Sequence, residues 1–66
     1  MYQLQDDVQT ALQARGIAEA KQRAFLAASE TPTAYLYEMS QFGGNNQVDA
    51  IIRVAAKREL RLRMEH

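Results

Sequence analysis

Cysteine is absent from this 66-residue chain, and histidine occurs only once, as His66. Without cysteine the chain can form neither a disulfide nor a thiolate metal site. A lone histidine has no partners for a zinc site, and it gives no support to a Ser–His–Asp or Cys–His catalytic arrangement. We therefore expect no metal, no cofactor and no enzyme activity.

The sequence also has no long apolar run and no excess of charge of one sign. No stretch approaches the roughly 20 apolar residues of a membrane span. Near the amino terminus, Asp6 and Asp7 stand where a signal peptide would carry basic and apolar residues. These features predict a cytoplasmic protein without a membrane segment. Eight basic and eight acidic side chains cancel, which weighs against strong nonspecific binding to nucleic acid.

The length predicts one small domain, residues 1–66. Apolar residues recur at helical spacing, and no segment indicates a strand. A first helix begins near Leu4 and ends at Gly16, a residue type that commonly follows the last turn of a helix. An alanine-rich second helix covers residues 18–29. We therefore predict an all-α fold, a compact bundle of four to five short helices.

The stretch after Ser29 predicts a helix stop and a restart. Thr31 is expected to cap a third helix whose first residue is Pro32, because proline is favoured at that position. This helix runs to about Phe42, and Tyr35, Leu36 and Met39 are expected on its inner side. A loop of glycines and asparagines precedes a fourth helix with the expected apolar stripe Val48, Ile51, Ile52, Ala55, Ala56, Leu60 and Leu62.

The order of parts from Gln22 to Leu60 is a short helix (QRAFLAAS), a tight turn (ET), a second helix (PTAYLYEMSQF), a polar loop and a helix reading VDAIIRVAAKREL. This order resembles the helix-turn-helix domain of the Cro and phage-repressor family, over roughly two-thirds of the chain. In this resemblance Gln22 opens the first motif helix, and Phe25 and Leu26 take inner positions.

The resemblance implies a sequence-specific DNA-binding transcription regulator, of phage or prophage origin, that binds double-stranded DNA as a homodimer. Gln22 would contact a phosphate at a helix N-terminus. Thr33 and Ala34 would meet base edges in the major groove. The residues assigned to DNA contact by position are Lys21, Gln22, Arg23, Thr33, Ala34, Tyr37, Glu38, Asn45 and Asn46.

The remaining residues of this set have subsidiary roles in the resemblance. Tyr37 and Glu38 lie one helical turn beyond the first base-contacting positions, and Asn45 and Asn46 would hold backbone phosphate from the loop. Taken singly, each residue also fits a solvent-exposed side chain, and the two asparagines fit local capping or turn chemistry. It is their order along the chain that favours DNA binding.

The distribution of charge favours a different function. No Lys or Arg occurs from Ala24 to Ile52, and Glu30 and Glu38 fall in this stretch. Exposed tyrosines also favour a protein interface, because tyrosine and methionine are common residue types there. The main alternative is therefore a small helical adaptor or inhibitor that docks on a larger protein.

The last fourteen residues carry a basic run: Arg53, Lys57, Arg58, Arg61 and Arg63. Cations suit the C-terminal end of a helix, so a solvated helix face accounts for this run at least as well as a phosphate-binding role. The same helix suggests self-association, because Ile51, Ala55 and Leu62 share one stripe. A structural dimer built on this helix is the third possibility.

Overall fold

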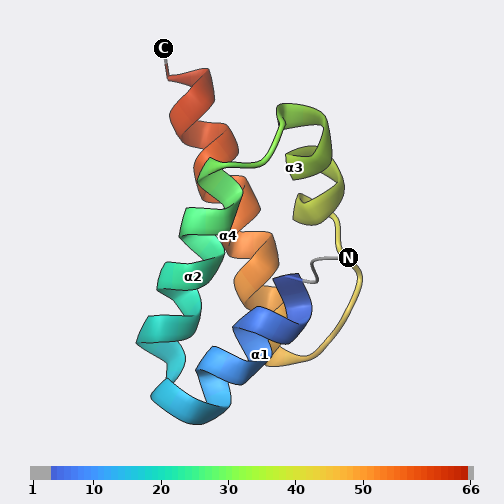
Figure 1. Cartoon of the computed structure of the whole chain (residues 1–66). Coiled ribbons are helices and arrows are strands. Elements are labelled where there is room, and N and C mark those ends of the chain that lie inside the picture. The colour runs from blue at the N-terminus through green and yellow to red at the C-terminus, as the bar shows by residue number, and fades with distance from the viewer. Residues whose placement is uncertain (1–3, 66) are drawn as a thin grey trace.

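The computed structural model describes residues 4–65, and His66 lies outside the described residues. Within that range the chain forms four helices: α1 (Leu4–Arg15), α2 (Ile17–Ser29), α3 (Thr33–Ser40) and α4 (Gln47–Met64). Helices α1 and α2 form a hairpin, and α4 runs the length of the molecule beside them (Figure 1). The predicted all-α fold is confirmed. The Cro-type arrangement of its helices stays a prediction.

Gly16 separates α1 from α2 with a single residue. Its φ of 96° lies in the left-handed region, which glycine adopts without the penalty that a Cβ would bring. The Gly16 amide still donates to the Leu12 carbonyl at 3.2 Å, and the Gly16 carbonyl accepts from Ala20 at 3.2 Å. The chain therefore reverses direction with its backbone hydrogen bonds satisfied, and the predicted end of the first helix is confirmed.

The stop and restart between α2 and α3 is also present, but the roles of its residues differ from the expectation. The Thr31 hydroxyl donates to the Ala27 carbonyl at 2.7 Å, so Thr31 closes α2 instead of capping α3. Pro32 stands at the N-cap with an extended ψ of 147°, and α3 begins at Thr33. The prediction of Pro32 as the first helical residue was thus early by one position, because the Thr31 side chain finds its partner in the preceding helix.

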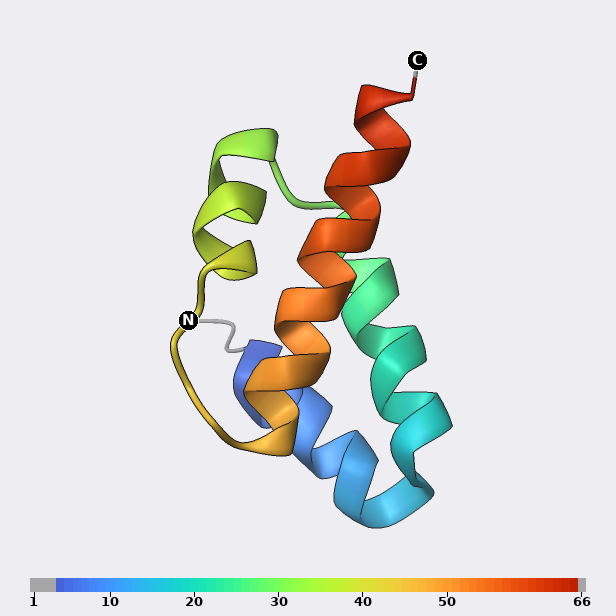
Figure 2. The same ribbon diagram turned by 180° about the vertical axis from the view of Figure 1, so that it is seen from behind.

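The loop between α3 and α4 is fixed by side chains of α4. The Arg53 guanidinium donates to the carbonyls of Phe42 and Gly44 at 2.7 and 2.6 Å. The Asn46 side chain accepts from the Asp49 amide at 2.9 Å and so caps α4. The loop returns from α3 to the far end of the molecule along one side, as the view from behind also shows (Figure 2).

Asp49 is the one buried charged residue among those described, with 6% of its surface exposed. It lies in the first turn of α4, where the helix dipole favours an acid, and it accepts a 3.3 Å hydrogen bond from the Gln5 side chain of α1. A Cβ added to Gly44 would collide with the Asp49 carboxylate, so the loop passes close to this residue only because position 44 is glycine.

The core lies between α4 and the other three helices. Of the eleven buried apolar residues within residues 4–65, six are alanines, which allow the helix axes to approach closely. Leu36 is the buried residue of α3, and Leu36 and Ile52 are confirmed as core, while Met39 is partly buried against it. The buried set is Val8, Ala11, Ala20, Ala24, Ala28, Leu36, Ile51, Ile52, Ala55, Ala56 and Leu60.

Three residues expected on inner faces are exposed. Leu26 is 62% exposed, Tyr35 61% and Leu62 43%. Successive residues of a helix point about 100° apart, so Tyr35 turns away from the core when Leu36 enters it. Leu26 similarly flanks the buried alanines of α2, and Leu62 lies beyond the arc of α4 that the neighbouring helices cover. The expected inward orientation of these three side chains was wrong.

Within residues 4–65, none of the helices combines the length and the apolar character that crossing a membrane would require.

Candidate interaction surfaces

The three sequence-predicted DNA contacts on α2 point in different directions. Arg23 forms ion pairs with Asp7 of α1 at 3.1 Å and with Glu19 at 3.7 Å, so its charge is compensated within the fold. Lys21 lies on another flank of α2, beside α4. Gln22 is exposed. The predicted flanking pair of cations therefore does not form one positive patch.

The four predicted contacts on α3 lie on one short helix, but one of them has an intramolecular partner. The Thr33 hydroxyl accepts a 3.0 Å hydrogen bond from Arg63 at the end of α4. Ala34, Tyr37 and Glu38 are exposed. The structure thus brings these four residues together as predicted, and the charge that they present to solvent is negative.

Asn45 and Asn46 lie apart from the start of α3. The loop that holds them leaves the other end of α3 and runs toward the end of the molecule where α1 joins α2 (Figure 1). Asn45 is exposed, whereas the Asn46 side chain is engaged in capping α4. Asn46 thus has the local capping role that the sequence allowed for both asparagines.

A groove with a volume of ≈ 570 Å³ lies between α2 and α3 and is closed at one end by α1. It exists because α3 packs mainly on α4 and makes little contact with α2. We call it the acidic groove and define it by Leu26 of α2, by Glu30 directly after α2, and by Tyr35, Glu38 and Met39 of α3.

Helical spacing sets the residues of the acidic groove in two rows. Leu26 and Glu30 are four residues apart, and Tyr35 is three and four residues from Glu38 and Met39, so each row lies on one face of its helix. Each row therefore combines exposed apolar surface with one carboxylate. Leu26 and Tyr35 are the exposed apolar side chains of these rows, since both are more than half exposed.

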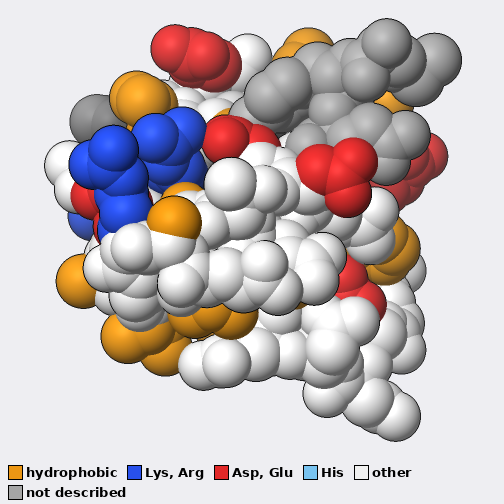
Figure 3. Space-filling view, turned by 60° about the horizontal axis from the view of Figure 1, so that its bottom comes forward, with side chains coloured by type: hydrophobic (Ala, Val, Ile, Leu, Met, Phe, Trp, Pro, Cys, Tyr) orange, Lys and Arg blue, Asp and Glu red, His pale blue; other side chains and the backbone are white. Residues whose placement is uncertain are grey.

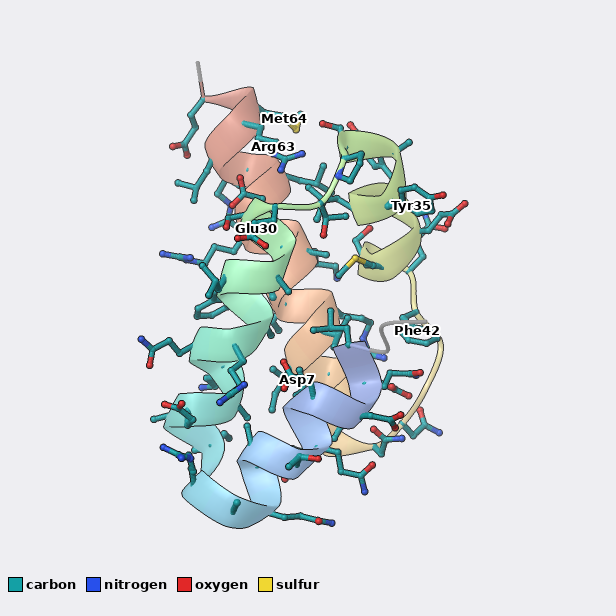
Figure 4. The ribbon with its side chains drawn as sticks, in the orientation of Figure 1. Asp7, Glu30, Tyr35, Phe42, Arg63 and Met64 are labelled. Carbon is teal, nitrogen blue, oxygen red and sulfur yellow. The ribbon has the colours of Figure 1, made fainter. Side chains whose placement is uncertain are left out.

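The charge of the acidic groove is negative and largely uncompensated. Asp7 and Arg23 neutralise each other at the edge formed by α1. Within residues 4–65, Glu30 and Glu38 take part in no ion pair. Figure 4 labels Asp7, Glu30 and Tyr35 on the three helices that bound this region. The groove is thus suited to apolar side chains accompanied by cations.

Arg63 fixes the position of α3 at the upper end of this groove. Its guanidinium donates to the Thr31 carbonyl at 2.7 Å and to the Thr33 hydroxyl at 3.0 Å, and its Nε pairs with Glu59 at 3.1 Å. Figure 4 shows Arg63 between the last turn of α4 and the start of α3. From the sequence alone, Arg63 belonged to a general basic run. Arg63 follows two core residues at helical spacing, Ala56 by seven positions and Leu60 by three, and this was the signal in the sequence that it points inward.

The outer side of α4 carries the opposite charge. We call this surface the basic strip and define it by Val54, Lys57, Arg58, Arg61 and Leu62, all exposed. Helical spacing at i, i+3, i+4 and i+7 aligns Val54 with the three cations. Among the described residues, Lys57 and Arg61 form no ion pair.

The basic strip continues onto α2 through an aromatic contact. The Arg58 guanidinium lies 4.6 Å from the centre of the Phe25 ring, a cation–π distance. Phe25 and Lys21 line the shallow pocket that joins α2 to Val54 of α4. Seen from the end where α1 meets α2, the visible Lys and Arg side chains gather at one side, and most visible Asp and Glu side chains lie elsewhere (Figure 3).

The stripe that suggested a dimer is not free for pairing. Ile51 and Ala55 are buried within the fold, and only Leu62 of that stripe is exposed. At the far end of α4, Leu60 is buried and Arg63 folds back onto the α2–α3 turn, while Leu62 and Met64 are exposed. Self-association through Ile51 and Ala55 would require the core to open, and the homodimer stays a prediction.

Comparisons of this chain with models of protein families, with curated proteins and with solved structures found no match. Among the described residues, no group of three or more His, Cys, Asp or Glu side chains is arranged to hold a metal ion.

Proposed function

We propose that this protein is a small noncatalytic protein-interaction module that binds a basic amphipathic helix of a partner in the acidic groove. The observation that carries the proposal is the pairing, in one concave surface, of exposed Leu26 and Tyr35 with two carboxylates that lack ion-pair partners within residues 4–65. An exposed apolar surface with a polar rim is typical of an interaction site.

The shape of the groove suits a helix that is recognised along one face. Helix-in-groove recognition uses apolar anchors at i, i+3, i+4 and i+7, and a groove of ≈ 570 Å³ has room for a few such side chains. Glu30 and Glu38 would pair with Lys or Arg beside those anchors. Such charges mainly raise the association rate and select the partner. The small surface predicts a weak, micromolar complex of the transient class.

The same charges weigh against DNA as the ligand of α3. Glu38 lies on the helix that would enter the major groove, where it would repel phosphates, although a carboxylate can accept from a cytosine amino group. Arg23 is already paired with Asp7 and Glu19. DNA binding stays a prediction of the sequence resemblance, and a DNA duplex serves as a second probe in the binding experiment.

Binding of a designed peptide tests the proposal. The probe is a synthetic helix with Leu at i, i+4 and i+7 and Lys beside them, and the matched probe carries Glu in place of Lys. Glu30→Gln with Glu38→Gln should weaken binding of the Lys probe about fivefold, because each exposed charge pair contributes about 0.5 kcal/mol. Gln9→Lys with Gln13→Lys is the control, since it shifts the net charge equally on the exposed side of α1.

Equal affinity for the Lys and Glu probes would overturn the proposal, as would equal effects of the groove and control variants. A duplex DNA oligonucleotide forms the other arm. If it binds with a steep salt dependence, and if Lys21→Ala and Glu38→Gln alter that binding, DNA binding through α3 replaces the proposal.

A further inference from the structure

The outer face of α4 has the chemistry that the acidic groove would select. Val54 and Leu62 are exposed apolar side chains eight residues apart on one helix, and Lys57, Arg58 and Arg61 lie between them. A basic amphipathic helix of this kind is the partner proposed above. The chain therefore carries both halves of one complementary pair of surfaces.

The two surfaces cannot meet within one molecule. On α2, Leu26 and Glu30 face the groove with α3, whereas Lys21 and Phe25 face α4 and adjoin the basic strip. The groove and the strip thus lie on opposite flanks of α2, and the strip belongs to a straight helix packed in the core. Both surfaces are consequently exposed at the same time in a single copy.

We propose that the basic strip of one copy docks in the acidic groove of a second copy. This inference rests on the proposed function, because it assigns an occupant to the same groove. The inference rests on charge complementarity. Glu30 and Glu38 of one copy would pair with two of the three cations of the other copy's basic strip. Val54 and Leu62 of that strip would pack against Leu26 and Tyr35. The net charge of zero means that two copies do not repel each other at long range.

The arrangement is head-to-tail, because different patches of the two copies are in contact. Such a contact forms a closed ring or an open chain of copies and leaves one free groove and one free strip in every open assembly. It differs in this respect from a two-fold dimer, in which the same patch of both copies is used. The contact should weaken as salt rises, since exposed charges are screened.

Mixing two complementary variants tests the inference. One variant carries Glu30→Lys with Glu38→Lys, which reverses the charge of the acidic groove and leaves the basic strip unchanged. The other carries Lys57→Gln with Arg61→Gln, which keeps the groove and neutralises the strip without disturbing the Arg58–Phe25 contact. Each is first shown by circular dichroism to keep its helices. The milder Glu30→Gln with Glu38→Gln replaces the first variant if that one unfolds.

Sedimentation of the wild type should show assemblies that grow with concentration and dissociate in high salt. Each variant alone should be monomeric, and an equimolar mixture should form a one-to-one dimer that grows no further. A wild type that is monomeric at submillimolar concentration overturns the inference. So does an equimolar mixture of the variants that stays monomeric, and so do variants that each self-associate as strongly as the wild type. Binding of the Lys probe by a monomeric wild type would leave the proposed function standing, which separates the two failures.

Discussion

Replacing Arg63 by alanine should destabilise the fold far more than an exposed position near a helix end normally would. Hydrogen bonds with a charged partner contribute about 1.5–3 kcal/mol each. Arg63 makes short bonds to the Thr31 carbonyl, the Thr33 hydroxyl and the Glu59 carboxylate, at 2.7, 3.0 and 3.1 Å, whereas its bonds to the Ala28 and Ser29 carbonyls are 3.4 Å long. Because Thr33 is exposed, water recovers part of their value, and we expect a loss of about 2 kcal/mol in the free energy of unfolding.

A loss of this size is large for a chain of 66 residues. At about 0.05–0.15 kcal/mol per residue, the whole stability is of the order of 3–10 kcal/mol. The melting temperature should fall by about 10 °C, and the midpoint of urea unfolding should fall with it. Arg63→Lys should recover less than half of the loss, because a single ammonium group lacks the planar fork that reaches several acceptors.

Arg61→Ala is the matched control, since Arg61 lies in the same part of α4, is exposed and forms no ion pair among the described residues. Its effect should stay within about 0.5 kcal/mol. A double-mutant cycle of Arg63→Ala with Thr33→Val should give a coupling energy of about 1 kcal/mol. Equal unfolding midpoints for the Arg63 and Arg61 variants, or a coupling near zero, would refute the reasoning.

Three further stability predictions follow from single positions. Leu36→Ala should cost about 2–5 kcal/mol in urea unfolding, because Leu36 is fully buried, and an unchanged midpoint would show that α3 is wrongly placed. Gly16→Ala should cost about 1–2 kcal/mol through its left-handed φ, and a neutral effect would contradict that conformation. Gly44→Ala should lower the free energy of unfolding by about 1–3 kcal/mol, because the added Cβ meets Asp49. Gly43→Ala is the control and should lower it far less, because a Cβ at Gly43 meets nothing within 4 Å. Equal losses for the two variants would argue against the close approach of the loop to Asp49.

The helices were predictable from the sequence because their ends are signalled locally. Gly16 needs a conformation that few other residues adopt, and the proline at position 32 cannot continue α2. Leu36 and Ile52 were identifiable as inner residues from helical spacing. The start of α3 was displaced by one residue, since the Thr31 hydroxyl could bond in either direction along the chain, and α3 ends at Ser40, before the expected Phe42.

The exposed surfaces were less predictable, because the residues that stay exposed on a helix depend on how much of that helix its neighbours cover. Helical spacing indicates that Tyr35, Leu36 and Met39 share a side of α3, but a helix of eight residues can bury only part of that side. Which part is buried depends on α3 lying against α4 and apart from α2. The role of Arg63 depends on the same placement, because its partners are 30 or more positions away in sequence.

The most direct test of the central claim is a map of amide chemical-shift changes on adding the Lys-bearing amphipathic probe to the isotope-labelled protein. We predict saturable changes at Leu26, Glu30, Tyr35 and Glu38, smaller at high salt and absent with the Glu-bearing probe. Amides on the exposed side of α1, such as those of Gln9 and Gln13, should stay unchanged. Changes confined to α1, or no change at millimolar probe, would contradict the assignment of the acidic groove as the binding site.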